Sequence, residues 1–296
     1  MSKYIGITIG DINGIGIEIL LNSIKKKRVN NIILFTNYKI FKNYILKKKI
    51  KININIINNK NLLNYDKNCL NIYSYNSSTL DENTYKSLKL SYEFCKENIC
   101  MGIITLPLRK DLIKKNIDNK FIGHTEYFQK IDKKKYSNMI LVHNKIIVSP
   151  LTTHIKINKI SKIIQNKNYL YNQIINLNNT LNKDFNFKIP KIAISGFNPH
   201  AGENGQIGNE EIKILIPLIK KLKKIGIKID GPYSADSMLI KKNLVKYHCF
   251  IFIFHDQALI PFKYISQFSG VNYTGNLDII RTSPDHGTAY NLIGSK

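Results

Sequence analysis

Short apolar runs alternate with helix-like segments along most of the chain, and this alternation constrains the fold more than any other feature. The chain opens on an apolar run at residues 3–9, followed by a glycine-rich segment at 10–16 and by apolar residues at helical spacing over 17–27. Further strand-like runs occupy residues 31–35, 51–57, 100–105, 191–195 and 250–254. Further helices are expected over residues 82–98, 158–182 and 210–224. Strands that alternate with helices predict an α/β protein whose sheet is mostly parallel.

A β-hairpin is expected to interrupt this alternation. Residues 138–142 and 145–149 are both strand-like, and the His143-Asn144 pair between them suits a tight turn. The sequence therefore predicts one antiparallel hairpin inserted into the mostly parallel sheet.

The 296 residues of the chain are enough for one large α/β unit or two smaller lobes. Of these residues 43% are hydrophobic, which is enough to form a core. No stretch approaches the roughly 20 apolar residues of a membrane helix. Residues 1–10 lack the basic and apolar regions of a secretory signal. The four cysteines form no C-x-x-C pair, which is typical of reduced thiols. We therefore expect a cytoplasmic protein without a membrane partner.

The formal net charge of +25 has two interpretations. Clustered positive charge binds phosphate backbones, so one is a nucleic-acid-binding protein. The other is compositional drift towards amino acids with AT-rich codons. Of the 45 basic residues 42 are lysine, and asparagine and isoleucine, which also have AT-rich codons, are overused as well. Selected nucleic-acid surfaces usually favour arginine, which forks onto phosphates and bases. We favour drift, so no nucleic-acid partner is expected, a basic nucleic-acid-binding protein remains the less favoured alternative, and Arg28, Arg109 and Arg281 become informative.

Three histidines follow strand-like runs. His255 directly follows the run 250–254, His200 follows 191–195, and His154 follows the second strand of the hairpin. Ligands of α/β proteins collect at the carboxyl ends of strands, so these imidazoles are candidates for one catalytic metal site. Asp256 beside His255 would then be a ligand or a hydrogen-bond partner. The alternative is that each histidine is an ordinary polar loop residue, because spacing does not show convergence.

The two glycine-rich segments carry weaker signals. Residues 10–16 lack the spacing of the dinucleotide-binding fingerprint, which favours a tight turn and close helix packing. Residues 202–208 suit either a mobile loop over a ligand or a flexible connector. Lys263, Asn272 and Arg281 follow His255 in the chain, and Arg281 would hold a phosphate or carboxylate through two parallel bonds.

Several long motifs resemble one enzyme family. They are GHTEYF at 123–128, GFNPHAGENGQIG at 196–208, FHDQALIPFKY at 254–264 and the whole segment 271–294. In this order they are similar to the 4-hydroxythreonine-4-phosphate dehydrogenases of pyridoxal phosphate (vitamin B6) biosynthesis. The resemblance implies a three-layer α/β/α fold of the isocitrate and isopropylmalate dehydrogenase type. Two interwoven lobes are expected with the active-site cleft between them, the first at roughly 1–120 plus 270–296 and the second at 121–269.

The resemblance also implies roles for individual residues. Three histidines are expected to bind one divalent ion (Zn, Mg or Co) in an active site that a homodimer shares: His154, His200 and His255. The substrate is expected to contact His124, Thr125, Lys263, Asn272 and Arg281. Asp236 and Asp256 are expected as catalytic polar neighbours. By analogy with the adenosine-binding loop of the related dehydrogenases, the cofactor NAD, or NADP, is expected near Asp285, His286 and Gly287.

The implied reaction is the oxidation of 4-phosphooxy-L-threonine at its 3-hydroxyl, followed by loss of CO2 to give 3-amino-2-oxopropyl phosphate. A sister enzyme acting on threonate- or erythronate-type 4-phosphates is the nearest alternative, since only contacts to the amino group would differ. One departure from the family is the segment 105–110, where TLPLRK replaces a TGP-type loop and lacks a glycine.

Overall fold

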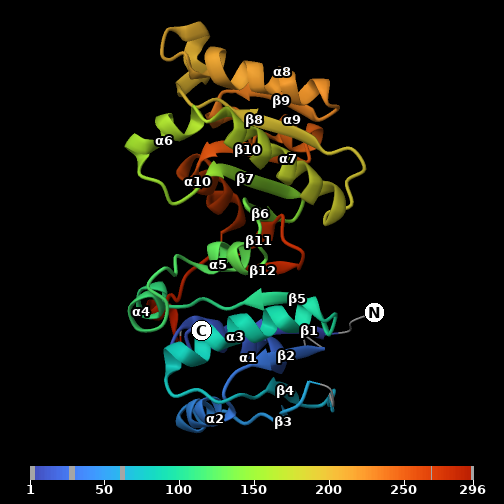
Figure 1. Cartoon of the computed structure of the whole chain (residues 1–296), viewed down its shortest axis with the longest axis vertical. Coiled ribbons are helices and arrows are strands. Elements are labelled where there is room, and N and C mark those ends of the chain that lie inside the picture. The colour runs from blue at the N-terminus through green and yellow to red at the C-terminus, as the bar shows by residue number, and fades with distance from the viewer. Residues whose placement is uncertain (1–3, 27–30, 61–63, 268, 295–296) are drawn as a thin grey trace. The chain divides into compact units, whose positions relative to one another are not determined.

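The computed structural model of the chain describes residues 4–26, 31–60, 64–267 and 269–294. It divides into two compact units, drawn in Figure 1. Met1–Asp132 and Leu277–Lys296 form the first unit, and Lys133–Asn276 forms the second. Each unit has its own core and is described by itself, and its strands are called the first or the second sheet.

The strands that the first unit contributes from the described residues are all parallel, in the order β3-β4-β2-β1-β5-β12. Their bounds are β1 Tyr4–Thr8, β2 Ile32–Phe35, β3 Ile54–Ile57, β4 Leu70–Tyr73, β5 Cys100–Thr105 and β12 Arg281–Pro284. In this sheet β1 lies between β2 and β5, so the strand order reverses beside β1. Such a reversal point is where open α/β sheets place their ligand crevices.

Helices cover both faces of the first sheet. Their bounds are α1 Ile15–Lys25, α2 Tyr38–Lys47, α3 Leu80–Lys96, α4 Lys110–Asn116 and α5 His124–Ile131. Alternate residues of β2 point to opposite faces. Leu34 packs with α1 and α2 in one cluster, and Phe35 packs with α3 and α5 in the other. This is a three-layer α/β/α arrangement, in which the strands read as nearly continuous apolar runs because both faces are buried.

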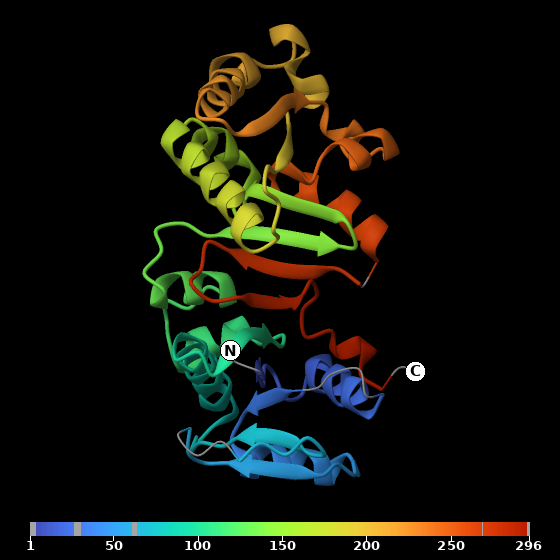
Figure 2. The same ribbon diagram turned by 90° about the vertical axis from the view of Figure 1, so that its right-hand side faces the viewer.

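The second unit has the strand order β11-β6-β7-β10-β8-β9 within the described residues. The strands are β6 Asn138–His143, β7 Ile146–Thr152, β8 Lys191–Ser195, β9 Lys228–Tyr233, β10 Cys249–Phe254 and β11 Val271–Gly275. β6 is antiparallel to both neighbours, and β7, β10, β8 and β9 run parallel. Figure 2 shows β6 and β7 side by side in green. The mostly parallel sheet with an inserted hairpin is confirmed.

Helices also cover both faces of the second sheet. They are α6 Ile157–Ile164, α7 Lys167–Lys183, α8 Ile216–Lys224, α9 Lys241–Lys246 and α10 His255–Ser266, with short turns η1 Pro199–Gly205, η2 Glu211–Leu215 and η3 Ala235–Ser237. Residues of α6, α7 and α8 pack on one face with Ile251, and residues of α10 pack on the other with Phe252. The predicted three-layer α/β architecture is therefore confirmed for each unit.

Two details differ from the sequence prediction. The single helix expected over 158–182 is two helices, because Asn166 caps the second one by accepting a hydrogen bond from Tyr169 N at 3.0 Å. The units change at 132/133 and 276/277, whereas changes near 120 and 270 were expected. The reason is that Tyr127 and Phe128 of α5 pack into the core of the first unit, and β11 pairs with β6 in the second.

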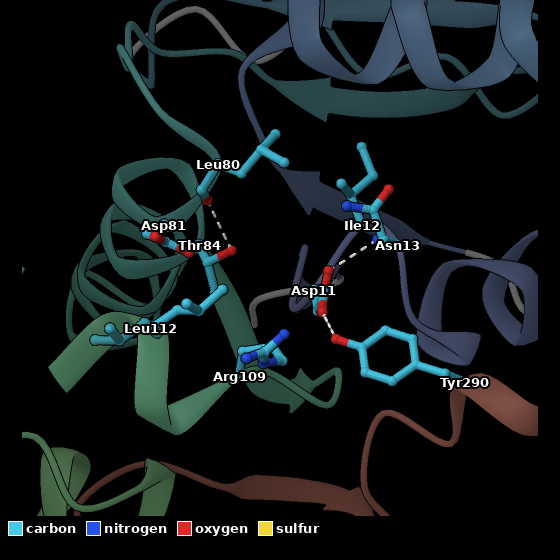
Figure 3. Close-up of a pocket in the computed structure, with 10 residues that line it drawn as sticks. Asp11, Ile12, Asn13, Leu80, Asp81, Thr84, Arg109, Leu112 and Tyr290 are labelled. Carbon is cyan, nitrogen blue, oxygen red and sulfur yellow. Dashed lines mark hydrogen bonds between the residues drawn. The ribbon is translucent and has the colours of Figure 1, made fainter. Parts of the chain in front are cut away.

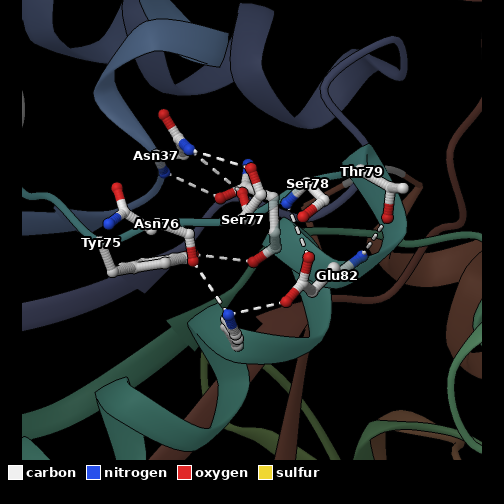
Figure 4. A network of polar contacts seen from close by, with 9 residues as sticks. Asn37, Tyr75, Asn76, Ser77, Ser78, Thr79 and Glu82 are labelled. Carbon is white, nitrogen blue, oxygen red and sulfur yellow. Dashed lines mark hydrogen bonds and ion pairs between the residues drawn. The ribbon is translucent and has the colours of Figure 1, made fainter.

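A network of polar contacts fixes the start of α3 in the first unit (Figure 4). Thr79 Oγ1 accepts a hydrogen bond from Glu82 N at 3.1 Å, and the Glu82 carboxylate accepts one from Ser78 N at 2.6 Å. This reciprocal pair is a capping box, which satisfies amides that the first helical turn leaves open. Asn37 Nδ2 donates to Ser77 at 3.3 Å and ties this segment to α2. Thr84 Oγ1 donates to Gly10 O at 2.7 Å, which holds the start of α3 beside the loop that follows β1.

Among the helices of the described residues, none combines the length and apolar character that crossing a bilayer requires.

Candidate functional site

Three histidines predicted from the sequence follow three neighbouring strands of the second unit. His154 comes two residues after β7, His255 directly follows β10, and His200 lies five residues beyond β8. In the sheet, β10 lies between β7 and β8 and is parallel to both. Their carboxyl ends therefore share one edge of the sheet, where α/β proteins bind ligands. This topological part of the prediction is confirmed.

Two of these histidines lie together. The ring centroids of His154 and His255 are 5.7 Å apart. His255 is the first residue of α10, and its Nδ1 lies 3.0 Å from Oδ1 of Asp256. A proton on Nδ1 that is donated to this carboxylate leaves the Nε2 lone pair available to a cation. Imidazole donors with a carboxylate behind one of them suit zinc or a similar divalent ion.

The third histidine sits in an unusual turn. His200 is exposed and opens a run of five residues, 200–204, whose backbone dihedrals are left-handed. Left-handed backbone costs about 1–2 kcal/mol for each residue other than glycine, so the surrounding structure must offset it. Within the described part of the chain, no three His, Cys, Asp or Glu side chains gather closely enough to hold a metal ion. The complete ligand set therefore stays a prediction.

Each of the two aspartates expected to assist catalysis lies near one of these histidines, Asp256 beside His255 and Asp236 in a turn that contacts the turn of His200. Asp256 is exposed in the first turn of α10. Asp236 is exposed in η3, which packs against η1, the turn that carries His200. Neither contact assigns a reaction step, so their catalytic role stays a prediction.

A second polar centre lies in the first unit, around Arg281 and His124. Arg281 is only 2% exposed, and its Nε and Nη2 donate to Thr105 Oγ1 at 3.0 and 2.5 Å. Burial lowers the pKa of Arg281 to about 9, which leaves the guanidinium charged at neutral pH. Burial, followed by the charges of Arg281 and Lys110, lowers the pKa of His124 well below its ordinary 6.5. His124 is therefore a neutral imidazole beside a buried cation.

Within the described residues, Nε2 of His124 is buried and has no hydrogen-bond partner. A buried polar atom without a partner costs free energy, and such atoms in native proteins commonly face a ligand or a water molecule. Asn272 on β11 shows the same feature in the second unit, where its Oδ1 is buried without a partner among the described residues. Both residues were predicted to contact substrate.

Two further charged residues near His124 were missed by the sequence prediction. A Cβ added to Gly123 would lie 3.3 Å from Lys110 Nζ and 3.0 Å from Glu126 Oε2, so both groups crowd the start of α5. Lys110 is one of 42 lysines, and nothing in its sequence context distinguishes it. Its closeness to Gly123 and its electrostatic effect on His124 identify it in the folded chain.

The remaining predicted substrate residues have less defined surroundings. Thr125 follows His124 in the first turn of α5 and is partly buried. Lys263 is exposed on α10 of the second unit. Their expected contacts with substrate stay predictions.

The segment expected to bind the cofactor packs against the glycine-rich loop that follows β1. Asp285, His286 and Gly287 lie after β12, and the next residue, Thr288, accepts a hydrogen bond from Ile15 N at 3.0 Å. The expected tight turn of the glycine-rich loop is confirmed: Gly10 has φ +59°, and a Cβ there would lie 2.5 Å from a carbonyl oxygen. The two segments thus form one surface in the first unit.

A cavity of about 210 Å³ opens beside this surface (Figure 3). Its lining comes from the loop after β1, the first turn of α3, the start of α4 and Tyr290 of η4 (Tyr290–Leu292). The Tyr290 hydroxyl donates to Asp11, and Arg109 pairs with Asp111. Arg109 lowers the pKa of Asp111 to about 2. The cavity therefore offers both carboxylate acceptors and a guanidinium donor to a polar ligand.

Comparisons with known proteins agree with this architecture. The model of the family described as "Pyridoxal phosphate biosynthetic protein PdxA" matches residues 28–296. The chain is 34% identical to the 4-hydroxythreonine-4-phosphate dehydrogenase of Aquifex aeolicus, over 99% of this chain and 92% of that protein. It is 29% identical to a Clostridium botulinum protein with the provisional name D-threonate 4-phosphate dehydrogenase, over 98% and 91%.

A solved structure shows the same fold. The 4-hydroxythreonine-4-phosphate dehydrogenase of Klebsiella pneumoniae superimposes with a TM-score of 0.86 at 26% identity, over 98% of this chain and 93% of that one. The family model covers far more than half of the sequence. The chain therefore belongs to the PdxA family of pyridoxal phosphate biosynthetic proteins.

Proposed function

We propose that the protein is an NAD-dependent dehydrogenase that oxidises 4-phosphooxy-L-threonine. The oxidised β-keto acid then loses CO2 and yields 3-amino-2-oxopropyl phosphate for pyridoxal phosphate biosynthesis. Membership of the PdxA family and the names of the relatives from Aquifex aeolicus and Klebsiella pneumoniae support this function.

The observation that carries the proposal is the buried centre around Arg281 and His124. A charged guanidinium at 2% exposure lies beside a buried imidazole nitrogen that has no hydrogen-bond partner in the described part of the chain, and this pair suits an anionic ligand. Arg281 would hold the phosphate or carboxylate of the substrate through parallel hydrogen bonds, and neutral His124 would add a single directed bond. Lys110 would supply further positive potential. Thr125, Lys263 and Asn272 are proposed as additional substrate contacts.

A divalent ion (Zn, Mg or Co) is proposed to bind His154, His200 and His255. When bound, it would stabilise negative charge on the reacting oxygen during oxidation and decarboxylation. Asp256 would orient His255 through Nδ1. A homodimer would complete the ligand set, because among the described residues of one chain no third ligand gathers with His154 and His255. Asp236 and Asp256 are proposed to assist proton transfer.

NAD, or NADP, is proposed to bind along Asp285, His286 and Gly287 and into the adjoining cavity. When bound, the nicotinamide accepts the hydride that leaves the substrate carbon. The cavity of about 210 Å³ is smaller than the roughly 300–1,000 Å³ of a typical small-molecule pocket, so it would take one end of the dinucleotide. Asp11 and Arg109 would then contact polar groups of that end. A cytoplasmic location is expected and stays a prediction.

A turnover assay with matched substrates tests the proposal. The purified protein is given NAD, a divalent metal and either 4-phosphooxy-L-threonine or the 4-phosphate of D-threonate. Equal yields of NADH and CO2, with the larger kcat/KM for the amino acid, are expected. A larger kcat/KM for the hydroxy acid would favour the sister activity, which the 29% identical Clostridium botulinum relative suggests. No NADH from either substrate with any of the three metals would refute the dehydrogenase assignment.

A further inference from the structure

The turn that carries His200 is held in a strained conformation by contacts that the proposed chemistry does not itself require. His200, Ala201, Gly202, Glu203 and Asn204 have φ values of 51°, 52°, 80°, 44° and 55°. Consecutive left-handed residues are rare because Cβ approaches the following carbonyl oxygen, and such strain persists only when the surrounding structure enforces it. Something outside the turn must therefore hold it.

The buried carboxylate of Glu211 provides this restraint. Glu211 is 1% exposed at the start of η2. Its Oε1 accepts hydrogen bonds from Phe197 N at 2.7 Å and Asn198 N at 2.8 Å, and its Oε2 accepts one from Asn198 Nδ2 at 2.9 Å. These donors lie immediately before the turn. The carboxylate therefore fixes the backbone at the point where the chain enters the left-handed run.

The turn then folds back over the same carboxylate. A Cβ on Gly202 would lie 2.6 Å from Glu211 Oε2, so only glycine fits at this close approach. A Cβ on Gly196 would lie 2.7 Å from Cα of Ala201 and 3.1 Å from Glu211 Oε1. The carboxylate is thus enclosed by both ends of the segment 196–202, and its position determines where His200 is presented.

The same segment is tied to the helix that carries His255. Gln257 Nε2 donates to Gly196 O at 3.2 Å, and Gln257 Oε1 accepts from Ile253 N at 3.1 Å. Gln257 lies two residues after His255 on α10. These hydrogen bonds hold the loop after β8 against the start of α10. A shift of the loop would therefore change the position of His200 relative to His255.

We propose that Glu211 is a positioning residue for metal binding. Its carboxylate holds the left-handed turn 200–204 and thereby presents His200 in the orientation that a divalent ion requires. The proposal rests on the proposed role of His200 as a metal ligand. It adds a residue, remote from any ligand atom, whose charge and hydrogen bonds set the metal affinity, as the partners behind metal ligands commonly do.

The test compares Glu211→Gln with Glu203→Gln in the full-length, metal-free protein. Both variants remove one negative charge near the turn, but Glu203 is exposed and Glu211 is the buried acceptor. Co²⁺ alone is titrated and followed by calorimetry and by its visible absorption, and hydrogen exchange is measured for residues 197–202. Glu211→Gln should weaken Co²⁺ binding by about 10–100-fold and speed exchange at Phe197 and Asn198. Glu203→Gln should leave both unchanged.

Two reference variants make each result decisive. His200→Ala should weaken Co²⁺ binding at least as much as Glu211→Gln does. If His200→Ala weakens binding and a folded Glu211→Gln protein does not, the positioning role of Glu211 is overturned while the proposed metal site stands. If His200→Ala itself binds Co²⁺ normally, the metal role of His200 fails and the proposal fails with it. Should Glu211→Gln not fold, Gly202→Ala perturbs the same contact, and normal Co²⁺ affinity in that variant overturns the proposal.

Discussion

Replacing Thr105 with valine should remove the hydroxyl that accepts hydrogen bonds from the buried Arg281 guanidinium. The Thr105 hydroxyl is fully buried and accepts two hydrogen bonds from the guanidinium. Valine has nearly the same shape but cannot accept a hydrogen bond, so Thr105→Val removes both contacts without creating a large cavity. The guanidinium would remain buried with fewer acceptors.

The size of the effect follows from the charge on the donor. Hydrogen bonds to charged groups contribute about 1.5–3 kcal/mol, and a buried charged donor that loses its acceptor also bears its desolvation cost. We therefore expect the free energy of unfolding to fall by about 1.5–3 kcal/mol. With a urea m-value of about 3 kcal/mol/M, the unfolding midpoint would fall by about 0.5–1 M. Because Arg281 would also lose its fixed orientation, the KM for the phosphorylated substrate should rise about tenfold or more.

The assay is urea unfolding combined with steady-state kinetics, with Thr105→Ser as the matched control. Serine keeps the hydroxyl and loses one methyl group, which costs about 1 kcal/mol, and it should leave the KM unchanged. A Thr105→Val protein with the wild-type KM and midpoint would refute the reasoning, because Arg281 would then be held by other contacts.

Three further predictions concern the predicted site residues. Arg281→Lys should raise the KM for substrate about tenfold, because lysine cannot fork onto an anion; an unchanged KM counts against this role. The pKa of His124 is lowered in the folded chain. Below pH 6.5 the imidazole is therefore protonated in the unfolded state before it is protonated in the folded state. As the pH drops, the free energy of unfolding should fall by up to about 1.4 kcal/mol per pH unit. In His124→Gln this part of the pH dependence should vanish, and urea midpoints from pH 7.5 to 5 test it. His200→Ala should abolish turnover and leave a folded dimer, and turnover at normal rates in metal-free buffer would contradict the metal site.

The sequence predicted the strand ends well, because they depend on local patterns. The apolar runs that became β8 and β10 are bounded by polar residues, and the histidines that follow them are at fixed positions in the chain. The rule that ligands collect at the carboxyl ends of parallel strands then placed His154, His200 and His255 at one edge. That rule does not give distances, so it could not show that His154 and His255 lie together without a third ligand among the residues that the structure describes.

The restraint on His200 could not be predicted in the same way. Glu211 opens a helix in an amphipathic segment, where a glutamate is usually solvent-exposed. Its burial depends on the left-handed turn, which the glycines at 202 and 205 suggest only as a place of unusual backbone. In the structure the turn packs on a carboxylate, a contact that neither alternative from the sequence, a mobile loop over a ligand or a flexible connector, had included.

The assignment of α5 also required long-range information. The family resemblance implied that the second lobe begins near residue 121. In the structure Phe121, Tyr127 and Phe128 pack into the core of the first unit. This packing brings His124 to Arg281, which is 157 residues later in the chain. The pairing of these two residues arises from tertiary contacts, and no local spacing encodes it.

The arginines show how composition can be interpreted once the structure is known. Lysine replaces arginine easily on a solvated surface, but not where a buried guanidinium uses several donors at fixed angles. Arg281 fits this rule, because it is 2% exposed and donates twice to Thr105, while Arg28 lies outside the described residues. The exposed ion pair of Arg109 with Asp111 contributes little to stability, because solvent screens it, and a lysine would largely replace it. In a chain with 42 lysines, an arginine at the cavity therefore supports the proposal that Arg109 contacts a ligand there through its forked geometry.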